Sequence, residues 1–249
     1  MTKILMHGCN GRMGRIITEN AGNDPEVTIV CGVDKFTGVE QKYPVYDDIK
    51  KCDVEADVIV DFSNALAVDG LLDYALSHKL PVVLCSTGLS QEQLDRVAAA
   101  SEEIPILRSA NMSLGINLIM KLIKEAEEVL SKAGFDIEIV ERHHNKKLDA
   151  PSGTALALAD AMNEEKKYEY IFDRSTRRAE RDSKEIGISA VRGGTIVGDH
   201  DVIFAGTDEV ITISHTAYSR ALFAKGALAA AVFLSGREKG MYDMSAVVG

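Results

Sequence analysis

Two histidines, two lysines and a helix-start signal are crowded into residues 141–154 of an otherwise acidic chain. His143, His144 and Lys147 can each donate or relay a proton near neutral pH. The Pro-Ser step at 151–152 indicates the start of a helix, whose first unpaired backbone N–H groups would face an anion. The segment therefore predicts a site that binds and protonates a negatively charged small molecule. The alternative is a solvated basic loop ahead of a helix.

A second signal lies at the N-terminus, where an apolar strand at residues 3–7 runs into a glycine-rich turn at residues 8–14 and then a helical pattern. This order is typical of dinucleotide-binding folds, because glycines let the backbone approach a pyrophosphate at the helix N-terminus. The glycine spacing is GxxGxxG in place of the usual GxGxxG, so the motif alone is weak.

The next apolar run, residues 27–33, strengthens that interpretation because it ends at Asp34, about twenty residues beyond the glycine turn. A carboxylate there accepts hydrogen bonds from the adenosine ribose and repels a 2′-phosphate, which favours NADH. Lys35 could pair with that phosphate and permit some use of NADPH. Alternatively, Asp34 is only a turn residue and Lys35 an ordinary solvated lysine.

Further strand-like runs at residues 56–61, 81–84 and 104–107 alternate with helical segments. This alternation predicts an α/β fold, a Rossmann-like doubly wound parallel sheet with helices on both faces. The loops at residues 85–88 and 109–113 hold small polar residues at the carboxyl ends of strands, where such sheets bind ligands. Ordinary helix capping is the alternative for both loops.

The pattern changes after residue 113. An amphipathic helix at residues 114–130 precedes an alternating strand at 135–140, and another helix follows at 154–162. Four more strand candidates separated by glycine turns predict a second, α+β domain with a mixed or antiparallel sheet; they are residues 186–191, 195–197, 201–205 and 209–215.

An alanine-rich helix at residues 220–234 must pack closely on a neighbour, and we expect it to return to the first domain. This predicts a dinucleotide-binding domain of residues 1–113 and 221–249. The second domain, residues 114–220, would bind the substrate and mediate oligomerisation.

Composition narrows the class of protein. The 249 residues are ample for two modest domains, and the net charge of −10 argues against a nucleic-acid partner. No apolar run approaches the length of a membrane span, and Met1 leads directly into the first strand, so we expect a cytoplasmic protein without a signal peptide or membrane partner. The basic run at residues 174–181 suggests a mobile loop or a subunit contact, with a solvated face as the favoured alternative.

Neither metal nor disulfide is expected. The four cysteines lack CxxC spacing. His143 and His144 would point to opposite faces of an extended strand, and no third ligand lies at zinc spacing.

Residues 8–14, residues 141–154 and the closing helix resemble the 4-hydroxy-tetrahydrodipicolinate reductase (dihydrodipicolinate reductase) family of bacterial lysine and diaminopimelate synthesis. The likeness spans essentially the whole chain. The combination of E-x-H-H-x-x-K-x-D-A-P-S-G-T-A with G-x-x-G-R-M-G is highly specific. The resemblance implies that NADH or NADPH reduces a small anionic dicarboxylate imine, and that the chain forms a homotetramer through its second domain.

The resemblance also implies residue roles. His143 and Lys147 would carry proton transfer, with the order between them left open, and His144, Gly153 and Thr154 would bind the substrate. The cofactor contacts would be Gly8, Cys9, Asn10, Gly11, Arg12 and Met13 at the pyrophosphate, Asp34 at the ribose, and Cys85, Ser86, Thr87, Ser109, Ala110, Asn111 and Met112 on the nicotinamide side. The family often has Gly-Thr-Thr at the positions of residues 85–87.

Two other functions stay open at this point. One is a different nicotinamide-dependent reductase that acts on an amino-acid-derived aldehyde or hydroxy acid. The other is a non-catalytic NAD-sensing module, which would explain the front half of the chain but would not need the His-His-Lys cluster.

Overall fold

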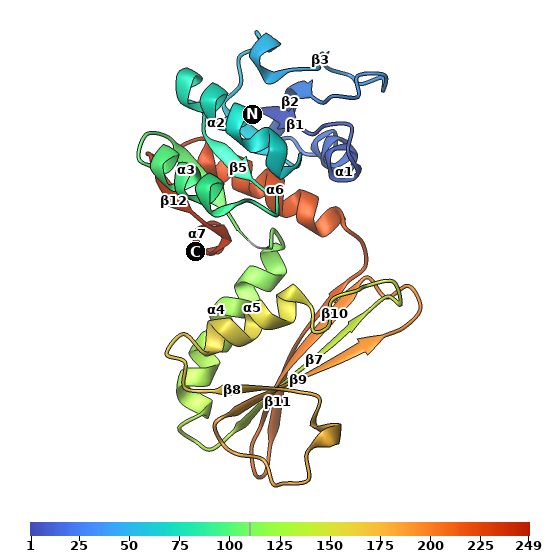
Figure 1. The fold of residues 1–249 in the computed structure, drawn as a ribbon, viewed down its shortest axis with the longest axis vertical. Coiled ribbons are helices and arrows are strands. Elements are labelled where there is room, and N and C mark those ends of the chain that lie inside the picture. Colours follow the sequence, from blue (N-terminus) through green and yellow to red (C-terminus); the bar gives the residue numbers. More distant parts are fainter. Residues whose placement is uncertain (110) are drawn as a thin grey trace. The chain divides into compact units, whose positions relative to one another are not determined.

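The chain folds into two compact units, one of Met1–Leu114 with Arg220–Gly249 and one of Gly115–Ser219. This computed structural model describes residues 1–109 and 111–249, and only the backbone of Thr176. Figure 1 shows the chain leaving the first unit after its first half and re-entering it through helix α6. The functional roles assigned to the two domains remain predictions.

The first unit is built on a seven-stranded sheet in which every strand pairs in parallel with its neighbours. The order is β12-β6-β5-β4-β1-β2-β3. Its strands are β1 (Thr2–His7), β2 (Val27–Val33), β3 (Val45–Tyr46), β4 (Val58–Asp61), β5 (Val82–Leu84), β6 (Pro105–Arg108) and β12 (Gly240–Tyr242). Its helices are α1 (Arg12–Ala21), the 3₁₀ turn Ile49–Lys51, α2 (Ala65–His78), α3 (Gln91–Ser101), α6 (Ala221–Leu234) and α7 (Met244–Val248).

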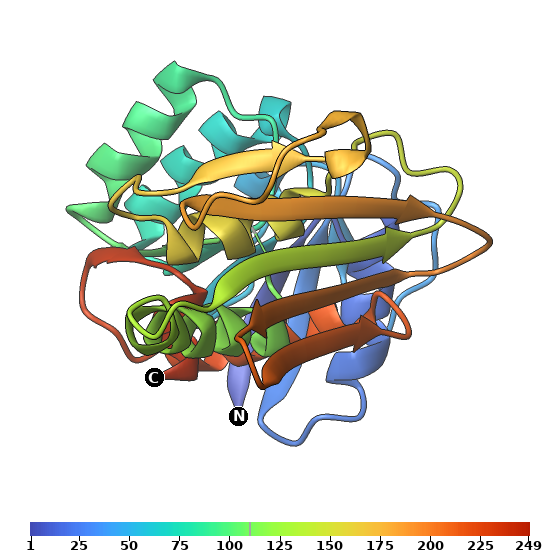
Figure 2. The same cartoon turned by 90° about the horizontal axis from the view of Figure 1, so that it is seen from below.

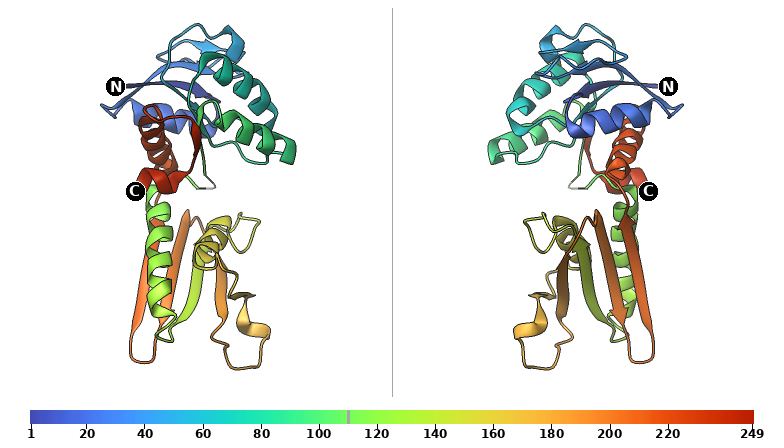
Figure 3. Two further views of the ribbon diagram at one scale, coloured as in Figure 1. Left: turned by 90° about the vertical axis from the view of Figure 1, so that its left-hand side faces the viewer. Right: turned by 90° about the vertical axis from the view of Figure 1, so that its right-hand side faces the viewer.

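Helices cover both faces of this sheet because successive strand side chains point to opposite sides. In β1, Ile4 packs with Ile17 of α1 and residues of α6, whereas Leu5 packs with Leu71 of α2 and Val97 of α3. Figure 3 shows α1 and α6 on one side of the strands and α2 and α3 on the other. The predicted doubly wound parallel sheet is confirmed.

Two glycines shape the turn that leads from β1 into α1. Gly8 has φ 81°, in the left-handed region, and a Cβ there would lie 2.7 Å from the carbonyl oxygen of Phe62. A Cβ at Gly14 would overlap the carbonyl oxygens of Gly8 and Cys9. The turn can therefore lie tight against the end of β4, and α1 tight against the turn.

The C-terminal segment contains two elements that the sequence pattern did not indicate. After α6 the chain forms β12, which pairs in parallel with β6 and extends the sheet, and then the short helix α7. Both are too short to show a periodic pattern.

The second unit holds a five-stranded mixed sheet in the order β11-β10-β7-β9-β8, which Figure 2 shows side by side. Strand β10 runs antiparallel to β7 and β11, while β9 runs parallel to β7 and β8. The mixed sheet predicted for this half is confirmed. The elements are α4 (Leu114–Leu130), β7 (Asp136–His143), α5 (Gly153–Met162), β8 (Glu169–Phe172), the 3₁₀ turn Arg174–Thr176, β9 (Glu185–Arg192), β10 (Gly198–Ala205) and β11 (Val210–Ala217).

Strand β7 runs three residues past the predicted end at residue 140, and this extension positions the site. Ile137 and Ile139 pack in a core shared with α4 and α5. Because the alternation continues to the end of the strand, Glu141 and His143 are also buried and lie on that same face. The segment of residues 141–154, for which a solvated basic loop was the alternative interpretation, therefore begins inside the core.

The basic run at residues 174–181 is held by ion pairs within its own unit. Arg181, whose side chain is 16% exposed, donates to Asp136 at 2.7 Å and to Glu138 at 3.0 Å. Arg174 and Arg177 both pair with the buried Glu185. These arginines neutralise acidic residues on β7 and β9. The prediction of a mobile loop, a subunit contact or a solvated face did not anticipate these ion pairs.

Across the described ranges, no helix combines the length and apolar character that crossing a membrane requires.

Candidate active site

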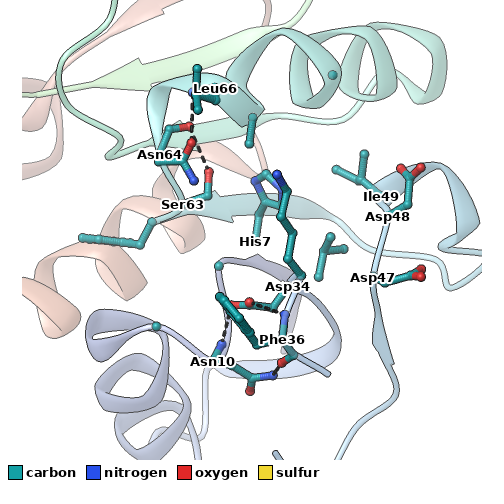
Figure 4. Close-up of a pocket in the computed structure, with 17 residues that line it drawn as sticks. His7, Asn10, Asp34, Phe36, Asp47, Asp48, Ile49, Ser63, Asn64 and Leu66 are labelled. Carbon is teal, nitrogen blue, oxygen red and sulfur yellow. Dashed lines mark hydrogen bonds between the residues drawn. The ribbon is translucent and has the colours of Figure 1, made fainter. Parts of the chain in front are cut away.

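The first unit has a pocket of about 500 Å³ at the carboxyl ends of β4, β1 and β2, shown in Figure 4. Four predicted cofactor residues, Gly8, Asn10, Gly11 and Asp34, line it. The other lining residues are His7, Val33, Lys35, Phe36, Asp47, Asp48, Ile49, Phe62, Ser63, Asn64, Leu66, Ala67 and Gly70. The pocket lies where a parallel sheet of this type binds ligands.

Asp34 ties the glycine turn to the end of β2. Its Oδ2 accepts a hydrogen bond from the backbone N–H of Asn10 at 3.0 Å, and its Oδ1 accepts one from Phe36 at 3.0 Å. Gln41 donates to the Asn10 side chain at 2.8 Å. The Asp34 carboxylate is thus held in the lining of the pocket, where Figure 4 also shows Asp47 and Asp48. Lys35 lines the same pocket.

The remaining predicted residues at the glycine turn have different surroundings. Cys9 is buried, and burial together with the nearby Asp34 charge raises the pKa of its thiol to about 12, so the thiol is unreactive. Arg12 is exposed and Met13 half-buried in the first turn of α1. Gly11 occupies the N-cap of α1, where no side chain caps the helix, so a phosphate can take that place.

The predicted nicotinamide-side loops also differ among themselves. Ser86 is buried, and its hydroxyl donates to Asp61, whereas Cys85 is half-buried and Thr87 exposed. In the second loop, Ser109 donates to the Asn111 carbonyl at 3.1 Å and Met112 is buried in the core with α6 residues. Ala110 lies outside the described residues. Among the described residues of these two loops, none lines the pocket described above.

A polar cluster centred on Asp61 was missed from sequence. This carboxylate has no exposed surface and accepts hydrogen bonds from Ser63 Oγ at 2.6 Å and Ser86 Oγ at 2.5 Å. Its Oδ1 lies 2.7 Å from Nδ1 of His7, which also lines the pocket. The sequence signal that could have revealed this cluster is the position of its members: His7 and Asp61 each end an apolar strand, and Ser86 closely follows one. The carboxyl ends of these parallel strands lie on the same side of the sheet.

In the second unit, His143 has a buried carboxylate behind it. Its Nδ1 lies 2.6 Å from Glu141 Oε2, and Glu141 also accepts two hydrogen bonds from Arg192, each of 2.7 Å. Burial would raise the pKa of Glu141, but the hydrogen bonds from Arg192, His143 and the Ser152 backbone outweigh it and hold this pKa below its usual value. Glu141 is therefore an anion that can stabilise a protonated imidazole.

Lys147 and the start of α5 meet at one carboxylate. The Lys147 ammonium lies 2.9 Å from Asp149 Oδ2. Hydrogen bonds from Lys147 and from the backbone N–H of Gly153 lower the pKa of Asp149. Ser152 caps the helix by accepting a hydrogen bond from Ala155 at 3.1 Å. The predicted donors therefore already converge on a carboxylate, one that the chain itself supplies.

Two further histidines lie near this cluster. His200 contacts Ser152 Oγ through Nε2 at 2.9 Å and meets the His143 ring edge-on at 5.2 Å between centroids. Burial, helped by the His143 charge, lowers the pKa of His200 to about 4, so it is neutral at working pH. The buried Nδ1 of His144 has no hydrogen-bond partner among the described residues. His200 was missed from sequence because it lies 48 residues from Ser152.

The second unit thus brings together an anion-backed imidazole, an ammonium and the N-terminus of a helix. Such a set can bind a small carboxylate through the ammonium and the helix N–H groups. It can also move a proton through the imidazole or the ammonium. The predicted catalytic and substrate-binding residues His143, His144, Lys147, Gly153 and Thr154 all belong to this one unit.

Comparison with known protein families shows the family to which the chain belongs. Residues 2–112 match the family model described as dihydrodipicolinate reductase, N-terminus, and residues 115–248 match the one described as dihydrodipicolinate reductase, C-terminus. The chain belongs to the dihydrodipicolinate reductase family. This confirms the resemblance drawn from the two sequence motifs, and with it the class of nicotinamide-dependent oxidoreductase.

Named relatives agree over full length. The 4-hydroxy-tetrahydrodipicolinate reductase of Caldanaerobacter subterraneus subsp. tengcongensis is 55% identical, covering 100% of this chain and 98% of that protein. The one of Clostridium tetani is 50% identical, with 100% and 97% covered. These matches favour the dihydrodipicolinate reductase function over a different nicotinamide enzyme or a sensing module.

A solved structure of a family member shares the fold. Dipicolinate-bound dihydrodipicolinate reductase from Paenisporosarcina sp. TG-14 superposes with a TM-score of 0.82 at 23% identity, covering 98% of this chain and 97% of that one. More distant dehydrogenases share the same architecture, such as a myo-inositol dehydrogenase from Corynebacterium glutamicum, with a TM-score of 0.64 at 13% identity.

Proposed function

We propose that the protein reduces 4-hydroxy-tetrahydrodipicolinate to tetrahydrodipicolinate, in the diaminopimelate route of lysine biosynthesis, with NADH or NADPH as reductant. The observation that carries the substrate class is the convergence of Lys147 and the Gly153 N–H on the Asp149 carboxylate. Donors that bind the Asp149 carboxylate can also bind a carboxylate of the substrate, and the proposed substrate carries two carboxylates. The dipicolinate in the related structure is a dicarboxylate of the same kind.

The dinucleotide would be held by the pocket of the first unit and would supply the hydride. Gly8, Gly11 and the uncapped start of α1 would take its pyrophosphate, and Asp34 its adenosine ribose. The other glycine-turn residues and the loops at 85–87 and 109–112 stay proposed contacts. No metal is required by this scheme.

The second unit would supply the proton and hold the substrate. Hydride addition leaves electron density near the ring nitrogen, which the Lys147 ammonium would stabilise. His143, backed by Glu141, would transfer a proton at cytosolic pH. Gly153, Thr154 and His144 would hold the carboxylates, and the substrate carboxylate would take the place of Asp149 at Lys147.

The test is a coupled assay in which the cyclic imine is generated from pyruvate and aspartate semialdehyde while the absorbance of the reduced nicotinamide is followed. The wild-type chain should consume NADH. His143→Ala and Lys147→Ala should each lower kcat by about a hundredfold or more, the scale of positioned acid and base groups, with NADH affinity near wild type. Near-normal turnover in both variants would contradict the assigned roles.

The same assay tests coenzyme preference. Asp34, Asp47 and Asp48 oppose a 2′-phosphate and Lys35 favours it, so we expect NADH to be used at least as well as NADPH. A more than tenfold preference for NADPH, worth about 1.4 kcal/mol, would contradict the role of Asp34.

We further propose that the protein works in the cytoplasm as a homotetramer, without nucleic-acid or membrane partners. The edge strand β11 supports an oligomer, because it exposes Val210 and Ile211. Sedimentation equilibrium tests this assembly, and a monomer at micromolar concentration would contradict it.

A further inference from the structure

Glu141 is the centre of a hydrogen-bond network that joins three elements of the second unit. The residue lies on β7, has no exposed surface, and receives four hydrogen bonds. Arg192 of β9 donates to Oε1 and Oε2, both at 2.7 Å. Ser152, the N-cap of α5, donates its backbone N–H to Oε1 at 2.9 Å, and His143 approaches Oε2 at 2.6 Å.

This arrangement decides which nitrogen of His143 carries a fixed proton. An ionised carboxylate has about four acceptor positions and no hydrogen to donate. Since Arg192 and the Ser152 N–H can only donate, and Glu141 is an anion, His143 must also donate, through Nδ1–H. The other ring nitrogen, Nε2, is therefore the one that can gain and lose a proton.

Space has been left beside that nitrogen. Gly198, the first residue of β10, lies next to the ring, and a Cβ at this position would be 2.9 Å from His143 Nε2. Gly198 pairs with Ala217 in a regular antiparallel ladder, and its backbone is not in the left-handed region. Glycine is therefore needed at residue 198 to leave room for the His143 imidazole, and not to allow an unusual backbone conformation.

The same network holds the loop between β7 and α5. Arg192 also donates to the Asp149 carbonyl oxygen at 2.6 Å, in the loop that contains Lys147. One buried ion pair thus fixes the proton-transfer histidine, the loop of the ammonium and the start of the helix. A pair that served only stability would not need to contact all three.

We propose that Glu141 is a positioning residue of the reductase, which with Arg192 fixes the Nδ1–H tautomer of His143 and aligns it with the start of α5, while Gly198 keeps Nε2 open to the substrate. The inference rests on the proposed role of His143 in proton transfer. The other titratable or charged groups of this cluster are Arg192 of β9, which pairs with Glu141, and His200 of β10, which meets the His143 ring. Lys147 of the loop and His215 of β11 act on His200.

The tautomer can be measured without substrate, by the nitrogen NMR shifts of labelled histidine side chains. The His143 signal is assigned from its loss in His143→Gln. At a pH where the ring is neutral, we expect the proton on Nδ1 in the wild-type chain and a changed tautomer in Glu141→Gln. A proton on Nε2 in the wild type would overturn the inference, whether or not the enzyme reduces the proposed imine.

Kinetics separates positioning from a structural role. Glu141→Gln should lower kcat at least about tenfold, as loss of an orienting carboxylate does, and should move the ionisation in the kcat/KM profile to lower pH because the imidazolium loses its anion. Glu138→Gln is a matched control, since it makes the same change on the same strand and removes an ion pair with Arg181. The control should keep the wild-type profile. Lower stability with an unchanged pH profile in Glu141→Gln would mean that the pair only stabilises the fold.

Gly198→Ala keeps the inference testable if Glu141→Gln does not fold. The added methyl group would force the His143 ring to move away from the strand, so turnover should fall at least about tenfold while NADH affinity stays unchanged. Gly193→Ala is its control, because a Cβ there meets no atom within 4 Å and the backbone is not left-handed. Wild-type turnover in Gly198→Ala would rule out Nε2 as the working nitrogen.

Discussion

His200 is a buried histidine that stays neutral beside His143, the residue for which we propose proton transfer. The residue is 5% exposed, and its ring bonds to the helix cap Ser152 and meets the His143 ring edge-on. A second imidazolium beside His143 would repel the first and destabilise the capped helix. The low pKa of His200 therefore protects the helix cap and suits the proton transfer proposed for His143.

This low pKa predicts acid sensitivity. The pKa of His200 falls from its usual 6.5 to about 4 in the folded chain, because burial penalises the charged ring. Between these values only the unfolded chain binds the proton, so stability rises with pH and is lost as pH falls through the window. The loss would reach about 3 kcal/mol near pH 4.

Urea unfolding at a series of pH values between about 4 and 7 measures this slope. His200→Gln should flatten the curve by removing its contribution. His78→Gln, which changes an exposed histidine of the first unit, should leave the curve unchanged. Equal slopes in the wild type and His200→Gln would show that another group controls acid stability.

Sequence alone can group residues that lie in one short motif, but it cannot group residues that are distant in the chain. His143 and Lys147 stand four residues apart in one segment, so sequence alone could group them. Arg192 reaches Glu141 across 51 residues, and Asp61 reaches His7 across 54. Only the sheet register, which a single sequence does not reveal, brings such pairs together.

At the scale of elements, the N-terminus of α5 carries the most direct prediction. A Cβ at Gly153 would meet no heavy atom within 4 Å, so the protein itself does not require glycine there. Gly153→Val should therefore fold normally but block a bound carboxylate. Dipicolinate inhibition should be lost, while the melting temperature stays near wild type.

Two variants at the same helix start complete this test. Thr154→Ala should weaken dipicolinate by about 1 to 3 kcal/mol, the cost of one hydrogen bond to a charged group. Ser152→Ala removes the cap hydrogen bond to Ala155 and should lower stability by about 1 kcal/mol. If Gly153→Val lost stability and kept normal inhibition, the glycine would be part of a helix cap and not of a carboxylate site.

Element boundaries followed the length of the periodic pattern. The helix at Leu114–Leu130 and the strand at Val27–Val33 have the bounds that their apolar spacing predicted. The elements missed were β3, β8, β12 and α7, of two to five residues each, which are too short to show a period. The prediction of a strand at residues 195–197 is wrong, since β10 begins at Gly198 after a turn.

At the scale of the whole chain, the return of the C-terminal segment explains the composition of α6. This helix buries alanines such as Ala227 and Ala231 in the core of the first unit. A Cβ at Gly226 would overlap the Met112 carbonyl oxygen, so the helix lies close against the backbone. The alanine-rich pattern predicted this close packing, and α6 lies in the first unit.

Each unit has its own core, and this predicts how ligands stabilise the protein. A ligand stabilises only the state that binds it, by about 2.7 kcal/mol at a hundredfold excess over its Kd. NADH alone should slow amide hydrogen exchange most at the glycine turn and around Asp34, both at the pocket of the first unit. Dipicolinate alone should slow exchange most in residues 141–154 of the second unit.

Two variants test this separation of the ligands. Asp34→Ala should weaken the NADH effect and leave the dipicolinate effect unchanged, and Gly153→Val should do the reverse. Protection of the same segments by either ligand alone would contradict the assignment of cofactor and substrate to separate units.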